Sequence, residues 1–165
     1  MNTRLINKKI MDISSPELQR NLNIWRFQEK KIVFTNGCFD ILHQGHYKYL
    51  ADSADLGDVF IIGLNSDASI KRIKGEMRPI NDQISRSMAL ASLFFVSCVV
   101  LFEEDTPYEL IKHIEPDILV KGGDYTPENI VGFDIVKKKQ GIVKTLDFIE
   151  GYSTTAIIKK IKNSY

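Results

Sequence analysis

The sequence is poor in the residues that define disulfide-rich and metal-rich proteins. Of its 165 residues, two are cysteine, three are histidine and one is tryptophan. Cys38 follows a polar strand end and Cys98 lies in an apolar run, so the two do not suggest a disulfide framework. Proteins without disulfides are typical of reducing compartments, and we therefore expect a cytoplasmic protein.

Long hydrophobic runs are also missing. The longest apolar stretch, residues 89–102, has 14 residues, two of them serine. A membrane-spanning helix needs about 20 apolar residues. The first 15 residues lack the apolar segment of a secretory signal peptide. We therefore expect no membrane partner.

An excess of charge of either sign is the third absence. Lys and Arg number 22 against 21 Asp and Glu, a net charge of +1. Such a chain has no overall field to gather nucleic acid, and its basic tracts at 137–139 and 159–162 lack interleaved aromatic residues. We expect no nucleic-acid partner. Phosphate binding, if present, must come from local placement of charge.

What the chain does contain is an alternation of strand and helix patterns. Ser15 and Pro16 are typical of a helix cap and its first position, which predicts a helical extension over residues 1–30. Further on, β-branched runs lie at residues 31–36, 58–65, 98–102, 117–122 and 142–148. Several are apolar throughout, which favours strands of a parallel sheet covered on both faces. We predict an α/β domain over residues 31–165, with a doubly wound parallel sheet.

The segments after these strands are rich in Gly, Lys, Asp, Ser and Thr. In doubly wound sheets, ligands bind outside the carboxyl ends of the strands. We therefore expect one functional edge. Its segments are "GCFDILHQGH", "NSDASIKRIKG", "FEEDTP", "KGGDY" and "EGYSTT".

His43 and His46, three residues apart, leave three interpretations open. They suit one helix face and therefore a zinc site, but no third or fourth ligand is evident. They also suit a structural pair. In the third interpretation, the helix that begins near Gly45 presents free N–H groups to an anion, and the histidines donate hydrogen bonds to its phosphate oxygens.

The whole segment "GCFDILHQGH" resembles the G-x-F-D-x-x-H-x-G-H signature of the nucleotidyltransferase superfamily. Further matches follow in order, and together they resemble the heptose 1-phosphate adenylyltransferase branch over about residues 31–162. The matching segments are "GLNSDASIKRIKGEMRPIN", "FEEDTP", "PDILVKGGDY" and "EGYSTTAIIKKI". The resemblance implies a Rossmann-like nucleotidyltransferase fold. It also implies a reaction in which ATP and D-glycero-β-D-manno-heptose 1-phosphate give ADP-heptose and pyrophosphate, for lipopolysaccharide core synthesis.

The resemblance assigns catalytic roles. His43 and His46 match the histidines that stabilise the α-phosphate and the departing pyrophosphate. Lys74 would neutralise phosphate charge, and Arg86 falls where the family has an arginine that contacts the substrate phosphate. Mg²⁺ is expected on the ATP phosphates, with no metal site built from protein side chains.

Nucleotide contacts are expected from several loops. Gly37 would admit the phosphates to the backbone. Cys38 stands where many members have threonine, and we interpret it as a marker of the heptose branch and not as a nucleophile. Asp40 is either a metal ligand or, as we favour, a brace for the loop. The predicted nucleotide-binding set is Thr35, Asn36, Gly37, Cys38, Phe39, Asp40, Gly45, Lys71, Gly122, Ser153, Thr154 and Thr155.

The sugar phosphate is expected at the end of two other strands. Lys121 and Asp124 in "KGGDY" suit the sugar phosphate, the heptose hydroxyls or the nucleotide ribose. Asn65 and Asp67 complete the predicted substrate-binding set. Residues 1–30 are too few for the sugar kinase domain that is often fused in front, so we expect a separate heptose kinase, and a homodimer of this chain.

Two alternative functions remain. A cytidylyltransferase acting on glycerol 3-phosphate resembles the same pattern, but residues 148–151 lack the arginine that precedes the last helix in that branch. A non-catalytic nucleotide-binding module would be expected to lose a histidine or a hydroxyl of "STT", and all of them are present.

Overall fold

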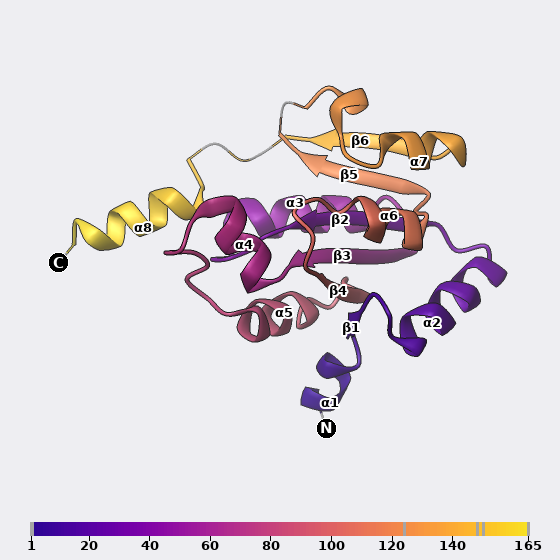
Figure 1. Cartoon of the computed structure of the whole chain (residues 1–165), viewed down its shortest axis with the longest axis horizontal. Helices are drawn as coiled ribbons and strands as arrows, with labels where there is room; N and C mark the ends of the chain where they lie inside the picture. Colours follow the sequence, from indigo (N-terminus) through magenta and orange to yellow (C-terminus); the bar gives the residue numbers. More distant parts are fainter. Residues whose placement is uncertain (1, 124, 148, 150, 165) are drawn as a thin grey trace.

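The computed structural model describes residues 2–123, 125–147, 149 and 151–164. Its centre is a six-stranded sheet in the order β1-β4-β3-β2-β5-β6, in which all neighbouring strands are parallel (Figure 1). The strands are β1 Ile10–Asp12, β2 Ile32–Gly37, β3 Val59–Asn65, β4 Cys98–Phe102, β5 Ile118–Gly122 and β6 Ile142–Leu146. The predicted parallel α/β architecture is confirmed.

Helices follow the strands along the chain. They are α1 Asn2–Asn7, α2 Pro16–Phe27, α3 Gln44–Ala54, α4 Asp67–Lys74, α5 Gln83–Ala91, α6 Tyr108–Ile114, the 3-10 turn η1 Pro127–Asn129, α7 Phe133–Lys138 and α8 Thr154–Lys162. Several start where the sequence offers a cap. Ser15 accepts from the backbone N–H of Leu18, and Asp82 does the same for Ser85.

The core lies on both faces of the sheet because successive strand residues point to opposite sides. In β2, Phe34 belongs to a buried cluster with residues of α2, α6 and α7. Its neighbour Val33 belongs to a second cluster with residues of α3 and α5. This alternation explains why the strand sequences are apolar throughout, and it is the packing that a doubly wound sheet requires.

Three element predictions differ from the structure. Strand β1 was not expected, and it pairs with β4 at the edge of the sheet, within the predicted extension 1–30. The boundary at residue 30 stays a prediction. The sequence pattern also predicts helices near residues 82–95 and 127–139. The first of these helices ends at Ala91, and the second region is divided into η1 and α7. Within the described residues, no helix has the length and apolar character needed to cross a bilayer.

Candidate active site

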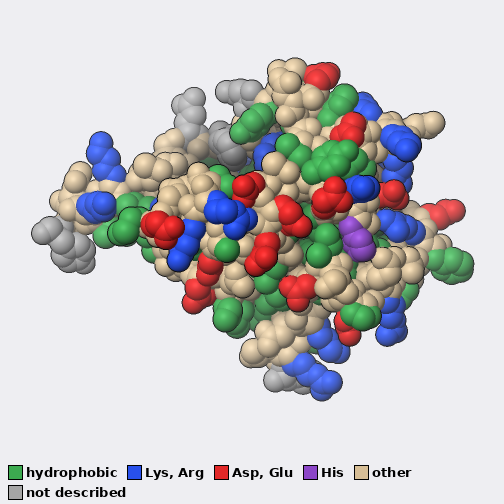
Figure 2. Space-filling view, in the orientation of Figure 1, with side chains coloured by type: hydrophobic (Ala, Val, Ile, Leu, Met, Phe, Trp, Pro, Cys, Tyr) green, Lys and Arg blue, Asp and Glu red, His purple; other side chains and the backbone are tan. Residues whose placement is uncertain are grey.

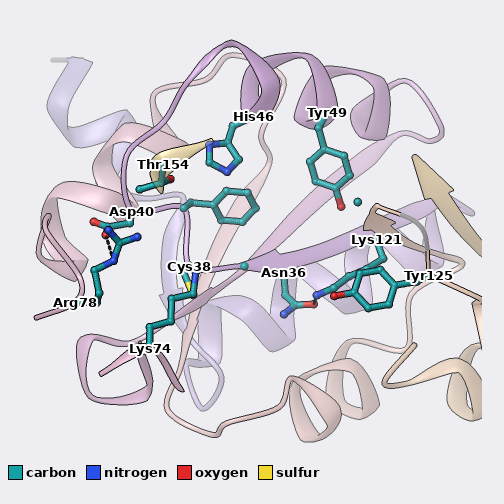
Figure 3. A pocket seen from close by; sticks show the side chains of 13 residues that line it. Asn36, Cys38, Asp40, His46, Tyr49, Lys74, Arg78, Lys121, Tyr125 and Thr154 are labelled. Atoms are coloured by element: carbon teal, nitrogen blue, oxygen red, sulfur yellow. Dashed lines mark hydrogen bonds and ion pairs between the residues drawn. The ribbon is translucent and has the colours of Figure 1, made fainter. Parts of the chain in front are cut away.

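A cavity of about 240 Å³ opens at the carboxyl ends of β2 and β5 (Figure 3). It brings together segments that are far apart in the sequence, as expected for a ligand site at the carboxyl edge of a parallel sheet. The lining residues are Asn36, Gly37, Cys38, Phe39, Asp40, His46, Tyr49, Lys74, Arg78, Lys121, Gly122, Tyr125 and Thr154. Ten of these thirteen were predicted site residues. We call this space the first cavity.

The two signature histidines stack on each other at the start of α3. Their ring centroids are 3.8 Å apart with an interplanar angle of 24°. His43 occupies the cap position of the helix without a side-chain cap bond, and His46 lies in its first turn and lines the first cavity. Both Nδ1 atoms are buried and without a hydrogen-bond partner among the described residues. Buried polar atoms are rarely left without a partner, so these atoms are candidates for contact with a ligand.

Burial keeps both histidines neutral at pH 7. Desolvation lowers the pKa of His43, and it lowers the pKa of His46 to about 4. The positive potential of His43 and Lys74 lowers the pKa of His46 further, while a hydrogen bond with the backbone of Ile41 opposes the shift. A neutral imidazole carries one N–H donor, which is what a hydrogen bond to a phosphate oxygen requires.

The pKa of His46 makes a titration testable. In NMR spectra of the protein without ligand, the ring signals of His46 should titrate near pH 4 and not near 6.5. Added ATP should raise this pKa, because phosphate charge stabilises the imidazolium. Spectra of His46→Gln assign the signals, and a pKa near 6.5 in the free protein would contradict the burial of the ring.

The same pKa predicts how stability depends on pH. Between pH 6.5 and about 4, the unfolded chain binds a proton at His46 that the folded chain does not. The free energy of unfolding should therefore fall as the pH drops through this window, and be unaffected by His46 above it. Urea unfolding of the wild type and His46→Gln at pH 7.5 and 5 measures the difference, and an equal loss in both proteins would contradict it.

The turn between β2 and α3 is shaped by packing. The hydroxyl of Thr35 is fully buried and hydrogen-bonds to the hydroxyl of Tyr49 at 2.6 Å. Tyr49 also donates to the carbonyl of Val120, so this contact joins β2, α3 and β5. A Cβ on Gly37 would approach the ring of Phe39 to 3.0 Å, so Gly37 makes room for that ring. Thr35 therefore belongs to the core, which corrects its predicted place among the nucleotide-binding side chains.

Gly45 has a related task in the first turn of α3. A Cβ at this position would lie 3.2 Å from the ring of His43 and 3.4 Å from Cβ of Tyr152. The glycine thus lets the stacked histidines and the segment before α8 come close to the helix. It lies behind the histidines and outside the lining of the first cavity.

Asp40 is the brace of this edge. The backbone N–H of Ile80 donates to both carboxylate oxygens, Oδ1 at 2.9 Å and Oδ2 at 3.0 Å. The backbone N–H of Asn81 donates to Oδ1 at 2.9 Å. Asp40 also pairs with Nε of Arg78 at 3.3 Å, while the Asp40 side chain is 2% exposed and that of Arg78 18%. The carboxylate is thus committed to protein donors, which favours the brace and not the metal ligand. In Figure 3 the pair borders the first cavity.

Positive charge at the site is local. Lys74, Arg78 and Lys121 line the first cavity. Burial lowers the pKa of Lys121, whose Nζ donates to Oδ1 of Asn36 at 3.3 Å. Elsewhere, basic and acidic side chains are interspersed over the face drawn in Figure 2. An anion is therefore attracted to the cavity by these three groups and not by a field of the whole molecule.

The three residues of the "STT" segment at the start of α8 have different positions. Ser153 caps the helix by accepting from the backbone N–H of Ala156 at 3.1 Å. Thr154 lines the first cavity, and its hydroxyl donates to the carbonyl of Ile41 at 3.4 Å. Thr155 is exposed and outside that lining. Only Thr154 of the three lies where a phosphate in the cavity would meet it.

Comparison with known proteins agrees with this geometry. The family model described as cytidylyltransferase-like matches residues 34–160. The chain belongs to the cytidylyltransferase-like family. The match begins within β2 and ends within α8, so every residue that lines the first cavity lies inside it. It confirms the resemblance to nucleotidyltransferases that the signature indicated.

Curated relatives of this cytidylyltransferase-like chain share the name Bifunctional protein HldE. The protein from Wolinella succinogenes is 54% identical over 152 residues, which are 92% of this chain and 31% of the relative. The protein from Nitratiruptor sp. is 61% identical over 134 residues, 81% of this chain and 28% of the relative. The chain thus spans about a third of the length of these relatives.

Solved structures show the same fold. The lipopolysaccharide core biosynthesis protein from Thermoplasma volcanium GSS1 superposes with a TM-score of 0.58 and 29% identity, over 75% of this chain and 99% of that protein. A pantoate-beta-alanine ligase from Francisella tularensis, at 13% identity, superposes with a TM-score of 0.56 over 93% of this chain and 77% of that one, and is alike in fold alone.

Arg86 occupies a different place from the one predicted for it in this cytidylyltransferase-like domain. Its side chain is fully buried. The guanidinium donates to three backbone carbonyls and pairs with a carboxylate, and so has no face toward the first cavity. Its partners are the carbonyls of Asn81, Cys38 and Asn65 at 3.0, 2.7 and 2.9 Å and Oδ1 of Asp67 at 2.7 Å. The predicted phosphate contact is therefore corrected to a structural clamp.

The clamp also accounts for two predicted substrate residues. Asp67 binds Arg86 and accepts from the backbone N–H of Gln83. The side chain of Asn65 is buried and donates to the hydroxyl of Ser69. Both side chains thus hold the ends of α4 and α5 against β3. Asp67 lines neither the first cavity nor the larger cavity of about 470 Å³ beside it, so its direct substrate contact is not supported. Asn65 does line that larger cavity, and its substrate contact stays a prediction.

Other predicted residues lie at or beyond the rim. Lys71 is exposed on α4 and outside the lining of the first cavity. Asp124 lies outside the described residues. Among the described residues, no three His, Cys, Asp or Glu side chains are grouped as a metal would require.

Three residues of the lining were missed. Arg78 lies in the matched segment "GLNSDASIKRIKGEMRPIN", but its contact with Asp40 spans 38 positions of sequence and cannot be predicted from spacing. Tyr49 and Tyr125 gave no signal beyond ordinary aromatic residues. Their position follows from how α3 and the segment after β5 pack on the sheet.

Proposed function

We propose that this chain transfers the adenylyl group of ATP to D-glycero-β-D-manno-heptose 1-phosphate, giving ADP-heptose and pyrophosphate. The observation that carries the proposal is the first cavity, where His46, Lys74 and Arg78 line one space of about 240 Å³. The choice of sugar is supported by the heptose-branch resemblance and by 54–61% identity to the HldE proteins. Lipopolysaccharide core synthesis is the pathway we infer.

The mechanism follows from the residues. A phosphate oxygen of the sugar phosphate attacks the α-phosphorus of ATP, an O–P bond forms, and the bond to the β-phosphate oxygen breaks. The neutral ring of His46, with His43 stacked on it, donates to the oxygens that gain charge at phosphorus. Lys74 and Arg78 neutralise the departing pyrophosphate, and Thr154 with the backbone of residues 36–39 orients it.

Mg²⁺ fits this site as a companion of ATP. Asp40, the one carboxylate among the described residues that line the first cavity, already accepts hydrogen bonds from backbone N–H groups and pairs with Arg78. The ion would therefore be held by phosphate oxygens and water, where it supplies charge neutralisation. No step assigned above to a side chain depends on a protein ligand for the ion.

The proposal also includes the compartment and the oligomeric state of the enzyme. We place the enzyme in the cytoplasm, where ATP is available, and infer a homodimer. Sedimentation that finds only monomer at micromolar concentration would contradict the dimer.

Pyrophosphate release tests the proposal directly. The protein is incubated with each of four nucleoside triphosphates against heptose 1-phosphate, mannose 1-phosphate and glycerol 3-phosphate. We expect turnover with ATP and heptose 1-phosphate, and little with CTP and glycerol 3-phosphate. The opposite preference would replace the proposal by the cytidylyltransferase alternative, and release with none of the pairs would support a non-catalytic module.

A further inference from the structure

A second cavity, of about 470 Å³, adjoins the first. The two share a wall made of Asn36, Gly37, Cys38, Lys74, Lys121 and Tyr125. Beyond this wall the second cavity is bordered by Asn65 at the end of β3, by residues 105–107 after β4, and by residues 129–131, which begin with the last residue of η1. Its size lies within the range of roughly 300–1,000 Å³ that small-molecule sites occupy.

The lining of the second cavity has the character of a sugar site. Asp105, Thr106 and Asn129 offer a carboxylate, a hydroxyl and an amide. Ile73 and Val131 offer aliphatic surface beside them. A polyhydroxylated ring needs both kinds of contact, since its hydroxyls exchange hydrogen bonds while its C–H faces pack on apolar side chains.

The polar loop after β4 is held in place before any ligand binds. Arg72 pairs with Oδ1 of Asp105 at 2.8 Å through Nε and also donates to the carbonyl of Glu103. The hydroxyl of Ser69 donates to the carbonyl of Glu104 at 3.0 Å. Helix α4 thus holds the loop through two of its side chains, Ser69 and Arg72. Asp105 keeps its second carboxylate oxygen for a ligand, and a loop that is already ordered binds at lower entropic cost.

The shared wall suits the transferring phosphate. Lys74 and Lys121 both belong to it, and in Figure 3 they lie to either side of Cys38 and Asn36. Of the residues assigned to the reacting phosphates of ATP, His46, Arg78 and Thr154 line the first cavity and not the second. Lys74 belongs to the shared wall and can contact the pyrophosphate as well as the acceptor phosphate. An in-line transfer needs the attacking oxygen and the leaving group on opposite sides of phosphorus. Two cavities that meet at one cationic wall provide this arrangement.

We infer that the second cavity binds the sugar of the acceptor, and that Asp105 and Asn129 select it through its hydroxyl groups. The inference rests on the proposed function, to which it adds where the acceptor lies and what recognises it. The acceptor phosphate lies at the wall between Lys74 and Lys121, and its oxygen attacks the α-phosphorus from the side of the second cavity.

Steady-state kinetics of Asp105→Asn and Asn129→Ala test the inference. Loss of one hydrogen bond to a hydroxyl should raise the KM for heptose 1-phosphate by roughly 3- to 10-fold. The KM for ATP and the kcat should stay within about 2-fold, because the nucleotide and the reacting phosphates are contacted elsewhere. The preference for heptose 1-phosphate over mannose 1-phosphate should fall as well, whereas a purely structural effect would weaken both acceptors equally.

Glu104→Gln is the matched control. It makes the same change from carboxylate to amide one residue away, but Glu104 lies outside the lining of both cavities. It should leave every constant near the wild-type value. Melting temperatures of all variants check that each is folded.

The outcomes separate the two proposals. If the wild type turns over and the variants raise the KM for ATP instead, or leave the KM for heptose 1-phosphate unchanged, the assignment of the second cavity is wrong. If the wild type uses a different acceptor, the proposed function fails. The same variants then show with that acceptor whether the second cavity binds it.

Discussion

His46→Ala should lower kcat by about 100- to 1,000-fold, as removal of one donor to the charge of a transition state does. His46 is the signature histidine that lines the first cavity, and its ring is neutral at pH 7. Because the donor acts mainly in the transition state, kcat and kcat/KM should fall by similar factors. Pyrophosphate release under saturating ATP and heptose 1-phosphate measures the effect.

His113→Ala is the control for this experiment. The third histidine lies in α6 and lines neither cavity, yet its Nε2 is also buried without a partner among the described residues. The same replacement there should leave kcat within about 2-fold, since no transition-state donor is lost. Turnover near the wild-type level in His46→Ala would remove His46 from the catalytic residues.

Arg86→Met should destabilise the fold by about 3–5 kcal/mol, because it leaves buried partners of a charged group without their donor. Three carbonyls and Asp67 lose hydrogen bonds of 2.7–3.0 Å at once. For a domain of this size, the loss corresponds to a fall in melting temperature of roughly 6–20 °C. Thermal and urea unfolding measure it, and Arg86→Lys should fall in between, since it keeps the charge but not the fork of donors.

Arg72→Met provides the comparison for burial. Arg72 also pairs with an aspartate at 2.8 Å, but its side chain is 50% exposed and that of Asp105 is 61% exposed. Exposed pairs contribute about 0–1 kcal/mol, so this variant should unfold almost as the wild type does. Equal stability of the Arg86 and Arg72 variants would show that the buried clamp is not what holds the loops.

The outline of this protein was accessible from sequence because its signals are local. The β-branched runs and the helix caps at Ser15 and Ser153 depend on residues a few positions apart, and they are where the pattern predicts them. Strand β1 was missed because three residues at a sheet edge carry too little periodicity, and their pairing with β4 spans 89 positions.

The candidate site likewise has features that follow from contiguous sequence and features that depend on distant contacts. The segment "GCFDILHQGH" is contiguous, so its histidines and glycines could be placed at one turn from sequence alone, and the family match agrees. Which charged residues face the cavity was decided by contacts between distant segments. Arg86 and Arg78 lie eight residues apart in one sequence region. Arg86 is nevertheless enclosed by three backbone carbonyls, while Arg78 pairs with Asp40 and lines the first cavity.

The sequence by itself therefore determined the parallel α/β fold, the edge that carries the loops, and the histidine turn, since each follows from patterns within a dozen residues. The tertiary structure alone decided that Thr35 and Arg86 are interior, that Asp40 serves Arg78, and that two cavities meet at Lys74 and Lys121. The physical reason is that the role of a buried charged side chain depends on the partners that compensate the cost of its desolvation. Those partners come from other strands and loops, so only the packed chain reveals them.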